Sequence, residues 1–301
     1  MRVLITGAGG QLGQALLALP PRADTEWLPF TRAQLDITDR QTVQRLVAKY
    51  RPDVIINTAA YTGVDKAETD SEQAFTVNAK GPEILAQVCA EHQVALVQLS
   101  TDFVFSGSAT QPYTEVDTTG PQSVYGRSKL AGEQAVLTSP GVQALVLRTS
   151  WLCSRYGHNF VKTLLAKMQQ GQALQVVNDQ IGSFTLADDL AGWIVALLPL
   201  LQQGKLPPLL HAANSGQCSW YDLAVAIQKT AVEQGVLQQP VAITPVSTDA
   251  YSVGKTLAPR PAYSALDNRL LSRYLFQTPQ SWQQALARCV AGLHTSSDKH
   301  S

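Results

Sequence analysis

The sequence has few charged residues, and those it has are balanced in sign. Charged side chains make up 15% of the 301 residues, with 23 Lys and Arg against 23 Asp and Glu. A chain without net charge lacks the basic excess that binds nucleic acid through its phosphates, so we expect no nucleic-acid partner. The hydrophobic content of 45% is enough for a packed core, which excludes an intrinsically disordered chain.

Cysteine and histidine are also scarce. The four cysteines have no C-x-x-C spacing and the five histidines are scattered, so the sequence shows no metal-ligand cluster. We therefore expect reduced thiols in a cytoplasmic protein instead of a disulfide framework. No run of about 18 uncharged apolar residues is present, and the first residues do not resemble a signal peptide. We expect no membrane partner.

Short apolar runs alternate with helical patterns through the first half of the chain. This βαβ repetition is typical of a parallel sheet with helices on both faces. We predict an α/β fold with a Rossmann-like doubly wound sheet and a ligand at the carboxyl ends of its strands. The predicted strands span residues 3–6, 27–30, 54–57, 95–99 and 144–147, and the predicted helices span 12–19, 40–49, 72–91 and 124–137.

The pattern loosens after about residue 150. We predict a nucleotide-binding domain over residues 1–150 and a smaller substrate-binding lobe over 151–301. Residues 187–213 are expected to return and extend the sheet, and the polar tail over 295–301 is expected to fray. Predicted helices span 159–170, 187–201, 220–234 and 279–293, predicted strands span 174–177, 209–212 and 241–245, and surface loops are expected at 205–208 and 247–261.

Three glycines lie between the first predicted strand and the first predicted helix. Gly7, Gly10 and Gly13 have the spacing G-x-x-G-x-x-G. Such glycines permit a tight turn, let a pyrophosphate approach the main chain, and let the helix pack on the strand. The pyrophosphate then lies at the positive end of the helix. The loop predicts a bound dinucleotide, with Gln11 and Leu12 as further contacts.

The second predicted strand ends without an acidic residue. A carboxylate there would bind the ribose 2′-hydroxyl and repel a 2′-phosphate. Thr31 and Arg32 stand there instead, and an arginine can hold a phosphate. We therefore predict NADPH as the cofactor, with use of NADH left open, and we place Asp36 and Ile37 beside the adenine. The small residues Ala59 and Ala60, with Tyr61, follow the third predicted strand and would let a flat cofactor ring approach closely.

A tyrosine and a lysine lie four residues apart on a predicted helix and so share one face of it. The phenol of Tyr125, with an ordinary pKa of about 10, is a weak acid until a nearby cation stabilises its phenolate. Lys129 supplies that cation, and the pair predicts a proton donor for a carbonyl under reduction. Thr101 follows the fourth predicted strand and can hydrogen-bond the same carbonyl oxygen.

The chain resembles the extended short-chain dehydrogenase/reductase superfamily and, within it, the dTDP-4-dehydrorhamnose reductase family. The resemblance covers about residues 2–293. It is carried by the glycine loop over 7–13, V-D-x-A-E within 57–68, S-T-D-x-V-F over 100–105, Y-x-x-x-K within 125–133, and the segments 148–151, 178–182 and 260–264.

The resemblance implies reduction by NADPH of the C4 keto group of dTDP-4-dehydro-L-rhamnose. The product would be dTDP-L-rhamnose, a donor for cell-surface polysaccharide. It assigns Tyr125 as the proton donor, Lys129 as the residue that lowers the tyrosine pKa and holds the nicotinamide ribose, and Thr101 as the residue that orients the carbonyl. Arg260 would bind the diphosphate in a fork. The implied substrate-binding residues are Thr101, Asp102, Trp151, Asn178, Gln180 and Arg260.

Two kinds of departure from the family pattern are visible. Phe103 stands where the family commonly has Tyr, and Phe184 stands where Pro is usual. Some family members dimerise through Mg²⁺ held by carboxylates, but the matching stretches here, 14–16 and 282–284, contain no acid. Because Mg²⁺ prefers charged oxygen ligands, we predict no bound Mg²⁺ and either a monomer or a metal-free homodimer.

Three alternatives stay open at this point. A nucleotide-sugar dehydratase of the superfamily usually has Asp-Glu after the threonine, whereas here Asp102 is followed by Phe103. A 4-epimerase uses the same tyrosine and lysine but retains NAD. A non-catalytic subunit that resembles the regulatory subunit of methionine adenosyltransferase would not need a complete proton-donor set.

Overall fold

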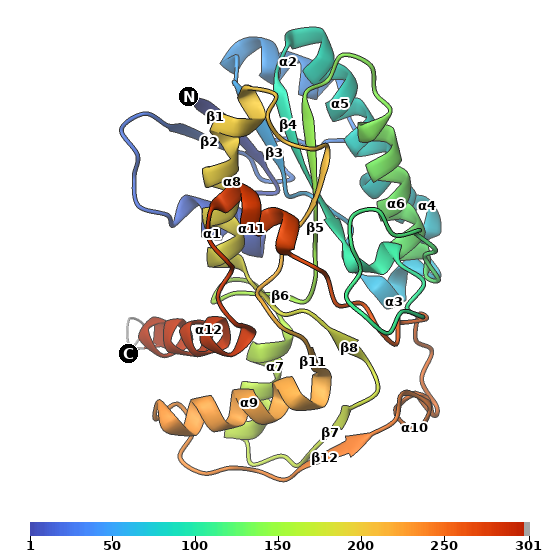
Figure 1. The fold of residues 1–301 in the computed structure, drawn as a ribbon, viewed down its shortest axis with the longest axis vertical. Coiled ribbons are helices and arrows are strands. Elements are labelled where there is room, and N and C mark those ends of the chain that lie inside the picture. The colour runs from blue at the N-terminus through green and yellow to red at the C-terminus, as the bar shows by residue number, and fades with distance from the viewer. Residues whose placement is uncertain (298–301) are drawn as a thin grey trace.

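The central element of the computed structural model, which describes residues 1–297, is a six-stranded parallel sheet (Figure 1). The strand order is β10-β5-β4-β3-β1-β2, and all neighbouring strands run parallel. The predicted Rossmann-like doubly wound fold is confirmed. The strands are β1 Arg2–Thr6, β2 Glu26–Pro29, β3 Val54–Asn57, β4 Ala95–Thr101, β5 Ala144–Thr149 and β10 Leu209–His211.

Helices cover both faces of this sheet, which explains why its strands are apolar on both sides. In β1, Val3 and Ile5 point to one face and Leu4 to the other, as the alternation of a strand requires. The first face packs against α1 Gln11–Leu17 and α8 Ala187–Gln202. The second face packs against α2 Arg40–Tyr50, α5 Gly81–His92 and α6 Val124–Leu137.

A smaller body lies below the carboxyl edge of the sheet (Figure 1). Its own apolar core lies between α7 Phe160–Gln169, α9 Trp220–Glu233 and α12 Trp282–Ser297. The chain leaves it for α8, which packs on the large sheet, and for β10, which joins that sheet. It leaves again at residues 269–275, which pack against α8 and β10. The proposed boundary at residue 150 stays a prediction. Short strand pairs complete this body: β7 Leu174–Val177 with β12 Ile243–Val246, β6 Leu152–Cys153 with β9 Thr185–Leu186, and β8 Ile181–Gly182 with β11 Cys218–Ser219.

The predicted helix over residues 72–91 is interrupted in the structure. It consists of α4 Ser71–Phe75, a π-helical turn Thr76–Lys80, and α5. Pro82 has no N–H to donate to the carbonyl four residues earlier, so the helix widens before it. The freed carbonyl of Asn78 lies against α6 at Gly132, where any Cβ would collide with it.

Three short helices were not predicted: α3 Val64–Ala67, α10 Thr248–Ser252 and α11 Arg269–Leu275. The segment 247–261, expected as a loop, contains α10. The expected fraying of the tail is wrong for residues 295–297, because α12 runs to Ser297. The rest of that tail, 298–301, lies outside the described residues.

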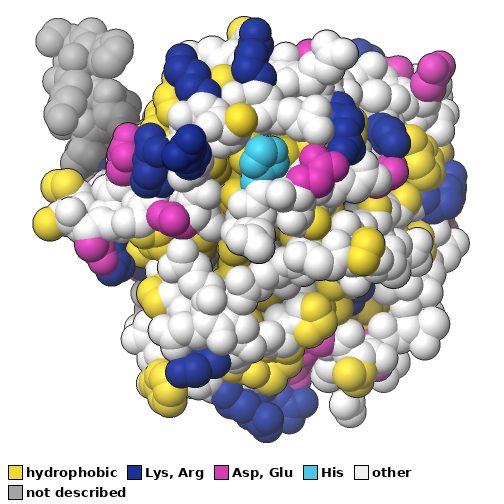
Figure 2. Space-filling model, turned by 90° about the horizontal axis from the view of Figure 1, so that it is seen from above, with side chains coloured by type: hydrophobic (Ala, Val, Ile, Leu, Met, Phe, Trp, Pro, Cys, Tyr) yellow, Lys and Arg dark blue, Asp and Glu magenta, His cyan; other side chains and the backbone are white. Residues whose placement is uncertain are grey.

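Surface charges of both signs are interspersed on the face seen from above (Figure 2). Within residues 1–297, no helix combines the length and apolar character needed to cross a membrane. The four cysteines are buried as free thiols. The described part of the chain holds no group of three or more His, Cys, Asp or Glu side chains placed to bind a metal ion.

Candidate active site

A cavity of about 1130 Å³ lies between the carboxyl edge of the sheet and the smaller body. Sites for a single small ligand usually measure about 300–1,000 Å³, so this one has room for more than one ligand. Its lining comes from the segments that follow β1, β2, β3, β4 and β5, from α6, and from the smaller body. The site therefore lies where a parallel sheet of this kind binds ligands.

The glycine loop has the backbone geometry that a dinucleotide requires. Gly7 has φ of +62°, and a Cβ there would lie 2.8 Å from the backbone N of Ala59. A Cβ on Gly13 would lie 2.6 Å from the Cα of Ala8, so this glycine lets α1 pack closely and does not itself line the cavity. A Cβ on Gly9 would meet no atom within 4 Å, so the backbone there is open to an approaching phosphate. Gly7, Gly10, Gln11 and Leu12 line the cavity.

Gln11 connects the glycine loop to the smaller body. Its Oε1 accepts hydrogen bonds from Ser154 Oγ (3.1 Å) and Asn159 Nδ2 (2.9 Å). Asn159 also caps α7, since its Oδ1 accepts from the N–H of Lys162. The predicted contact of Gln11 with the cofactor thus involves a side chain that also holds the two bodies together.

The segment after β2 presents the residues predicted for the adenosine end of the cofactor. Arg32 is exposed and lines the cavity, and within residues 1–297 no ion pair or hydrogen bond engages its guanidinium. Asp36 Oδ1 accepts from the N–H and the hydroxyl of Thr38, which shapes the turn. Ile37 is buried and lines the cavity beside Asp36. The guanidinium of Arg32, unpaired in the described part of the chain, suits a ribose phosphate.

Ala59, Ala60 and Tyr61 line the cavity after β3, and a residue that sequence reasoning missed holds them in place. Asn78 Oδ1 accepts from the N–H of Tyr61 (2.8 Å), and Asn78 Nδ2 donates to the carbonyl of Tyr61 (2.9 Å). The same Nδ2 donates to Ser128 Oγ on α6. A buried asparagine within an apolar helical pattern is the signal that could have revealed it.

The V-D-x-A-E segment also has a structural role that sequence reasoning did not assign. Glu68 Oε1 accepts from the N–H of Val124 (2.8 Å) at the start of α6, and Ser123 Oγ accepts from Gly126 N–H. These two caps satisfy N–H groups in the first turn of α6. They fix the position of the helix that carries Tyr125.

Tyr125 and Lys129 lie on one face of α6 and both line the cavity. Lys129 Nζ donates to the carbonyl of Leu99 (2.6 Å), and burial lowers its pKa to about 8 while the charge of Glu133 acts in the opposite direction. Burial raises the pKa of Tyr125 to about 12, and the Thr101 hydroxyl partly offsets this. The structure therefore does not show the lowered phenol pKa that the sequence predicts, because burial outweighs the other effects.

Thr101 ends β4 and faces Tyr125. Its Oγ1 lies 3.0 Å from Asp102 Oδ1 and accepts from the N–H of Phe103 (3.2 Å). The ring of Phe103 packs edge-on against Tyr125, with 5.5 Å between centroids. Asp102 lines the same end of the cavity and is only 2% exposed. The other family departure, Phe184, is fully buried in the core of the smaller body and does not line the cavity.

Aromatic rings form much of the cavity wall on the side of the smaller body. Trp151 has φ of +43° and stacks on Trp220 with 3.5 Å between centroids. A Cβ on Gly182 would lie 2.5 Å from the Trp151 ring, so only glycine fits beneath it. Phe160 packs against Trp220, and all three rings line the cavity. The sequence analysis named Trp151 but missed Trp220 and Phe160. Each is an aromatic residue at the first position of a helix, and that pattern could have revealed them.

Arg260 reaches the cavity but is already paired. Its two terminal nitrogens bind the two carboxylate oxygens of Asp65 at 2.8 and 2.9 Å, which lowers the pKa of Asp65. Asn178 and Gln180 do not line the cavity. Asn178 is exposed, and Gln180 Nε2 donates to Thr248 Oγ1. Their predicted role in binding substrate has no support from this arrangement.

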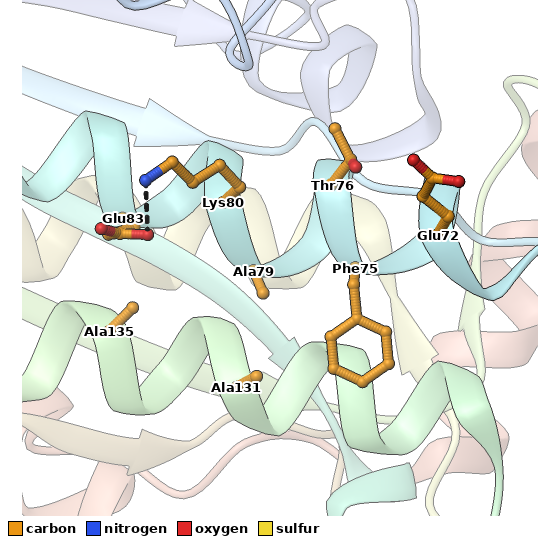
Figure 3. A pocket seen from close by; sticks show the side chains of 8 residues that line it. All are labelled: Glu72, Phe75, Thr76, Ala79, Lys80, Glu83, Ala131 and Ala135. Atoms are coloured by element: carbon orange, nitrogen blue, oxygen red, sulfur yellow. Dashed lines mark hydrogen bonds and ion pairs between the residues drawn. The ribbon is translucent and has the colours of Figure 1, made fainter.

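A second, shallower hollow lies between α4, the π-helical turn and α6 (Figure 3). Phe75, Ala131 and Ala135 line it, and Lys80 pairs with Glu83 at its rim (3.0 Å). None of the residues predicted for chemistry lies there. The large cavity is therefore the candidate active site.

The sequence matches a family model over nearly its whole length and is similar to named reductases. The family model described as "RmlD substrate binding domain" matches residues 1–295. A dTDP-4-dehydrorhamnose reductase from Aggregatibacter actinomycetemcomitans is 40% identical over 289 residues, which are 95% of this chain and 97% of that protein. A dTDP-4-keto-6-deoxy-D-glucose reductase from Streptomyces niveus is 37% identical over 287 residues, covering 95% of this chain and 96% of that protein.

A solved structure is similar over nearly the whole chain. It is the dTDP-4-dehydrorhamnose reductase from Bacillus anthracis in complex with NADP, with a TM-score of 0.87 and 36% identity. The match covers 96% of this chain and 98% of that one.

Proposed function

The chain belongs to the RmlD substrate binding domain family, and we propose that it reduces the C4 keto group of dTDP-4-dehydro-L-rhamnose to give dTDP-L-rhamnose. One observation carries the proposal. Thr101, Tyr125 and Lys129 line the same cavity as the glycine loop and Arg32, so a proton donor and a dinucleotide site face one space.

NADPH supplies a hydride for the carbonyl carbon when it is bound. The open backbone at Gly9, with Gly10 beside it in the cavity wall, would hold its pyrophosphate, and Arg32 would hold its 2′-phosphate. Ala59 and Ala60 leave room for a flat ring, because neither side chain extends beyond Cβ. These residues fit NADP, the cofactor in the complex of the related reductase from Bacillus anthracis.

Tyr125 donates its phenolic proton to the carbonyl oxygen as that oxygen gains negative charge. With a pKa of about 12, the phenol keeps its proton at neutral pH and has it ready for transfer. Lys129 would stabilise the phenolate that remains, and the Thr101 hydroxyl would orient the carbonyl. Lys129 has three N–H donors and uses one for the carbonyl of Leu99, so others are available for the cofactor ribose.

The smaller body supplies the surfaces for the nucleotide sugar. Trp151 and Trp220 offer flat apolar rings, and Arg260 offers a planar guanidinium that suits a diphosphate. Because Asp65 already occupies that guanidinium, binding a diphosphate would require Arg260 to exchange one anionic partner for another. Asp102 faces the reacting end of the cavity.

The assembly and location of the protein are part of the same proposal. Residues 14–16 and 282–284 carry no carboxylate that could hold Mg²⁺ between two copies. This supports a monomer or a metal-free homodimer. The buried free thiols support a cytoplasmic location.

Related activities make different demands on the site. A dehydratase needs a further acid and base, but the residue after Asp102 is Phe103, whose ring packs on Tyr125. A 4-epimerase would keep its cofactor oxidised between turnovers. A reductase of dTDP-4-keto-6-deoxy-D-glucose, the activity in the name of the Streptomyces niveus relative, needs the same proton donor and differs in the sugar's configuration.

The test is an NADPH-oxidation assay with each of the two 4-keto sugar nucleotides, prepared enzymatically. We expect turnover with dTDP-4-dehydro-L-rhamnose at a higher kcat/KM than with dTDP-4-keto-6-deoxy-D-glucose. The reverse order would assign the second sugar as substrate. Tightly retained NAD with no net oxidation of NADPH would show that the chain is not a reductase.

A further inference from the structure

The hydroxyl of Thr101 has more polar neighbours than it can hydrogen-bond in one orientation. Asp102 Oδ1 lies 3.0 Å from Thr101 Oγ1, and the N–H of Phe103 donates to the same oxygen from 3.2 Å. Tyr125 faces it from α6. A threonine hydroxyl has a single proton to donate and two lone pairs with which to accept.

The protonation state of Asp102 decides where that proton points. An ionised carboxylate can only accept, so Thr101 would have to donate to Asp102 and would have no proton left for a carbonyl oxygen. A neutral Asp102 can donate through Oδ1. Thr101 Oγ1 then accepts from Asp102 and from Phe103 N–H, and its own proton is free to point into the cavity.

The surroundings of Asp102 favour its neutral form. Its side chain is almost completely buried, and its Oδ2 has no hydrogen-bond partner among the protein atoms of residues 1–297. The hydroxyls of Ser150, after β5, and Ser264, in the segment before α11, face it and stabilise the charged form only in part. Burial without a cationic partner disfavours the charged form, and it raises the pKa of Asp102.

Charged and titratable groups near Asp102 do not reverse this preference. Tyr125, on α6, faces it and is neutral at assay pH, and an Asp102 charge would raise the tyrosine's pKa further. Lys129, one turn along α6, is directed to the carbonyl of Leu99 instead. Thr101 is the side chain through which Asp102 reaches the reacting atoms.

We propose that Asp102 acts as a neutral positioning residue, whose carboxylic acid donates to Thr101 and so directs the Thr101 proton to the oxygen under reduction. The proposal rests on the proposed function, because it states which groups donate hydrogen bonds to the carbonyl of the 4-keto sugar. The substrate oxygen would then receive two donors, the Thr101 hydroxyl and the Tyr125 phenol. Asp102 keeps its own proton throughout the reaction.

Infrared difference spectroscopy on the full chain can locate that proton without turnover. We expect a carboxylic-acid C=O band at neutral pH that shifts when aspartate is labelled with ¹³C at its side-chain carboxyl and disappears in Asp102→Asn. The label separates Asp102 from glutamates such as the half-buried Glu115, whose pKa is also raised. Loss of the band in Asp102→Asn assigns it to Asp102. If that variant folds poorly, the ¹³C shift in the wild type still shows that the band comes from an aspartate and not from a glutamate.

Kinetics supply the second readout. Asp102→Val removes the donor and should lower kcat by about 10²-fold with little change in KM, the size expected when one donor to a developing oxyanion is lost. Asp102→Asn restores an N–H donor at the same place and should recover most of that loss. In the wild type, kcat should not fall as the pH is lowered and Asp102 becomes more fully protonated.

Two results would overturn the proposal. One is an active enzyme whose Asp102 shows only the carboxylate bands at neutral pH. The other is an acid band that appears only as the pH is lowered and is accompanied by loss of kcat. The infrared band does not depend on catalysis, so a chain that keeps the band but oxidises no NADPH would refute the proposed function and leave the proton assignment standing.

Discussion

The ion pair between Glu133 and Arg148 leads to a specific prediction about the free energy of unfolding. Glu133 lies on α6, one turn beyond Lys129, and Arg148 lies on β5. Their side chains are 1% and 5% exposed, and three N–O distances of 2.7, 2.9 and 3.2 Å join them. His211 lies 3.5 Å from the guanidinium but has a pKa lowered to about 3 by burial and by Arg148, so it is neutral.

Glu133→Gln keeps the volume and removes the charge. Because Arg148 is then left buried without the carboxylate that it hydrogen-bonds, we expect the free energy of unfolding to fall by about 3–5 kcal/mol. The matched control is Glu26→Gln in the exposed pair with Arg2, whose side chains are 57% and 38% exposed. An exposed pair contributes about 0–1 kcal/mol, so this control should unfold nearly as the wild type does.

Urea unfolding followed by far-UV circular dichroism measures the difference, from the shift in midpoint at constant slope. The double variant Glu133→Leu with Arg148→Met removes both charges and should be less destabilised than Glu133→Gln alone, since no charge stays buried and unpaired. If Glu133→Gln costs less than about 1 kcal/mol, or if the double variant is the less stable of the two, the reasoning about this pair is wrong.

Three further predictions concern the active site. Tyr125→Phe should lower kcat by about 10²–10⁴-fold with the protein still folded, as measured by NADPH oxidation, and a variant near wild type would mean that the proton comes from elsewhere. Arg32→Ala should weaken binding of NADPH more than of NADH in fluorescence titrations, whereas equal weakening would remove the phosphate role. Lys129 carries its charge only below its pKa of about 8, so kcat/KM should decline as the pH rises through that value, and a profile that stays flat well above it would contradict the cationic role.

Local sequence patterns predicted the sheet, the glycine loop and the tyrosine–lysine pair because each depends on residues close together in the chain. Alternating apolar positions identify strands such as β1, and a spacing of four places Tyr125 and Lys129 on one helix face. The break in the predicted helix 72–91 is also local, and Pro82 marks it in retrospect.

Contacts between distant segments could not be predicted in this way. Arg260 was predicted to be available for a diphosphate, but it pairs with Asp65, 195 residues earlier in the chain. Asn78 holds the loop after β3, and Trp220 joins Trp151 in the cavity wall. Each of these depends on how packed elements meet, which the spacing of residues along one segment does not determine.

Isotope transfer tests the central claim most directly. NADPH carrying deuterium at the transferable C4 position is incubated with the chain and dTDP-4-dehydro-L-rhamnose, and the product is examined by NMR. The account predicts dTDP-L-rhamnose with deuterium at C4 of the sugar in wild-type protein, and very little product with Tyr125→Phe. A product without deuterium at that carbon, or unchanged formation of the deuterated product by Tyr125→Phe, would contradict it.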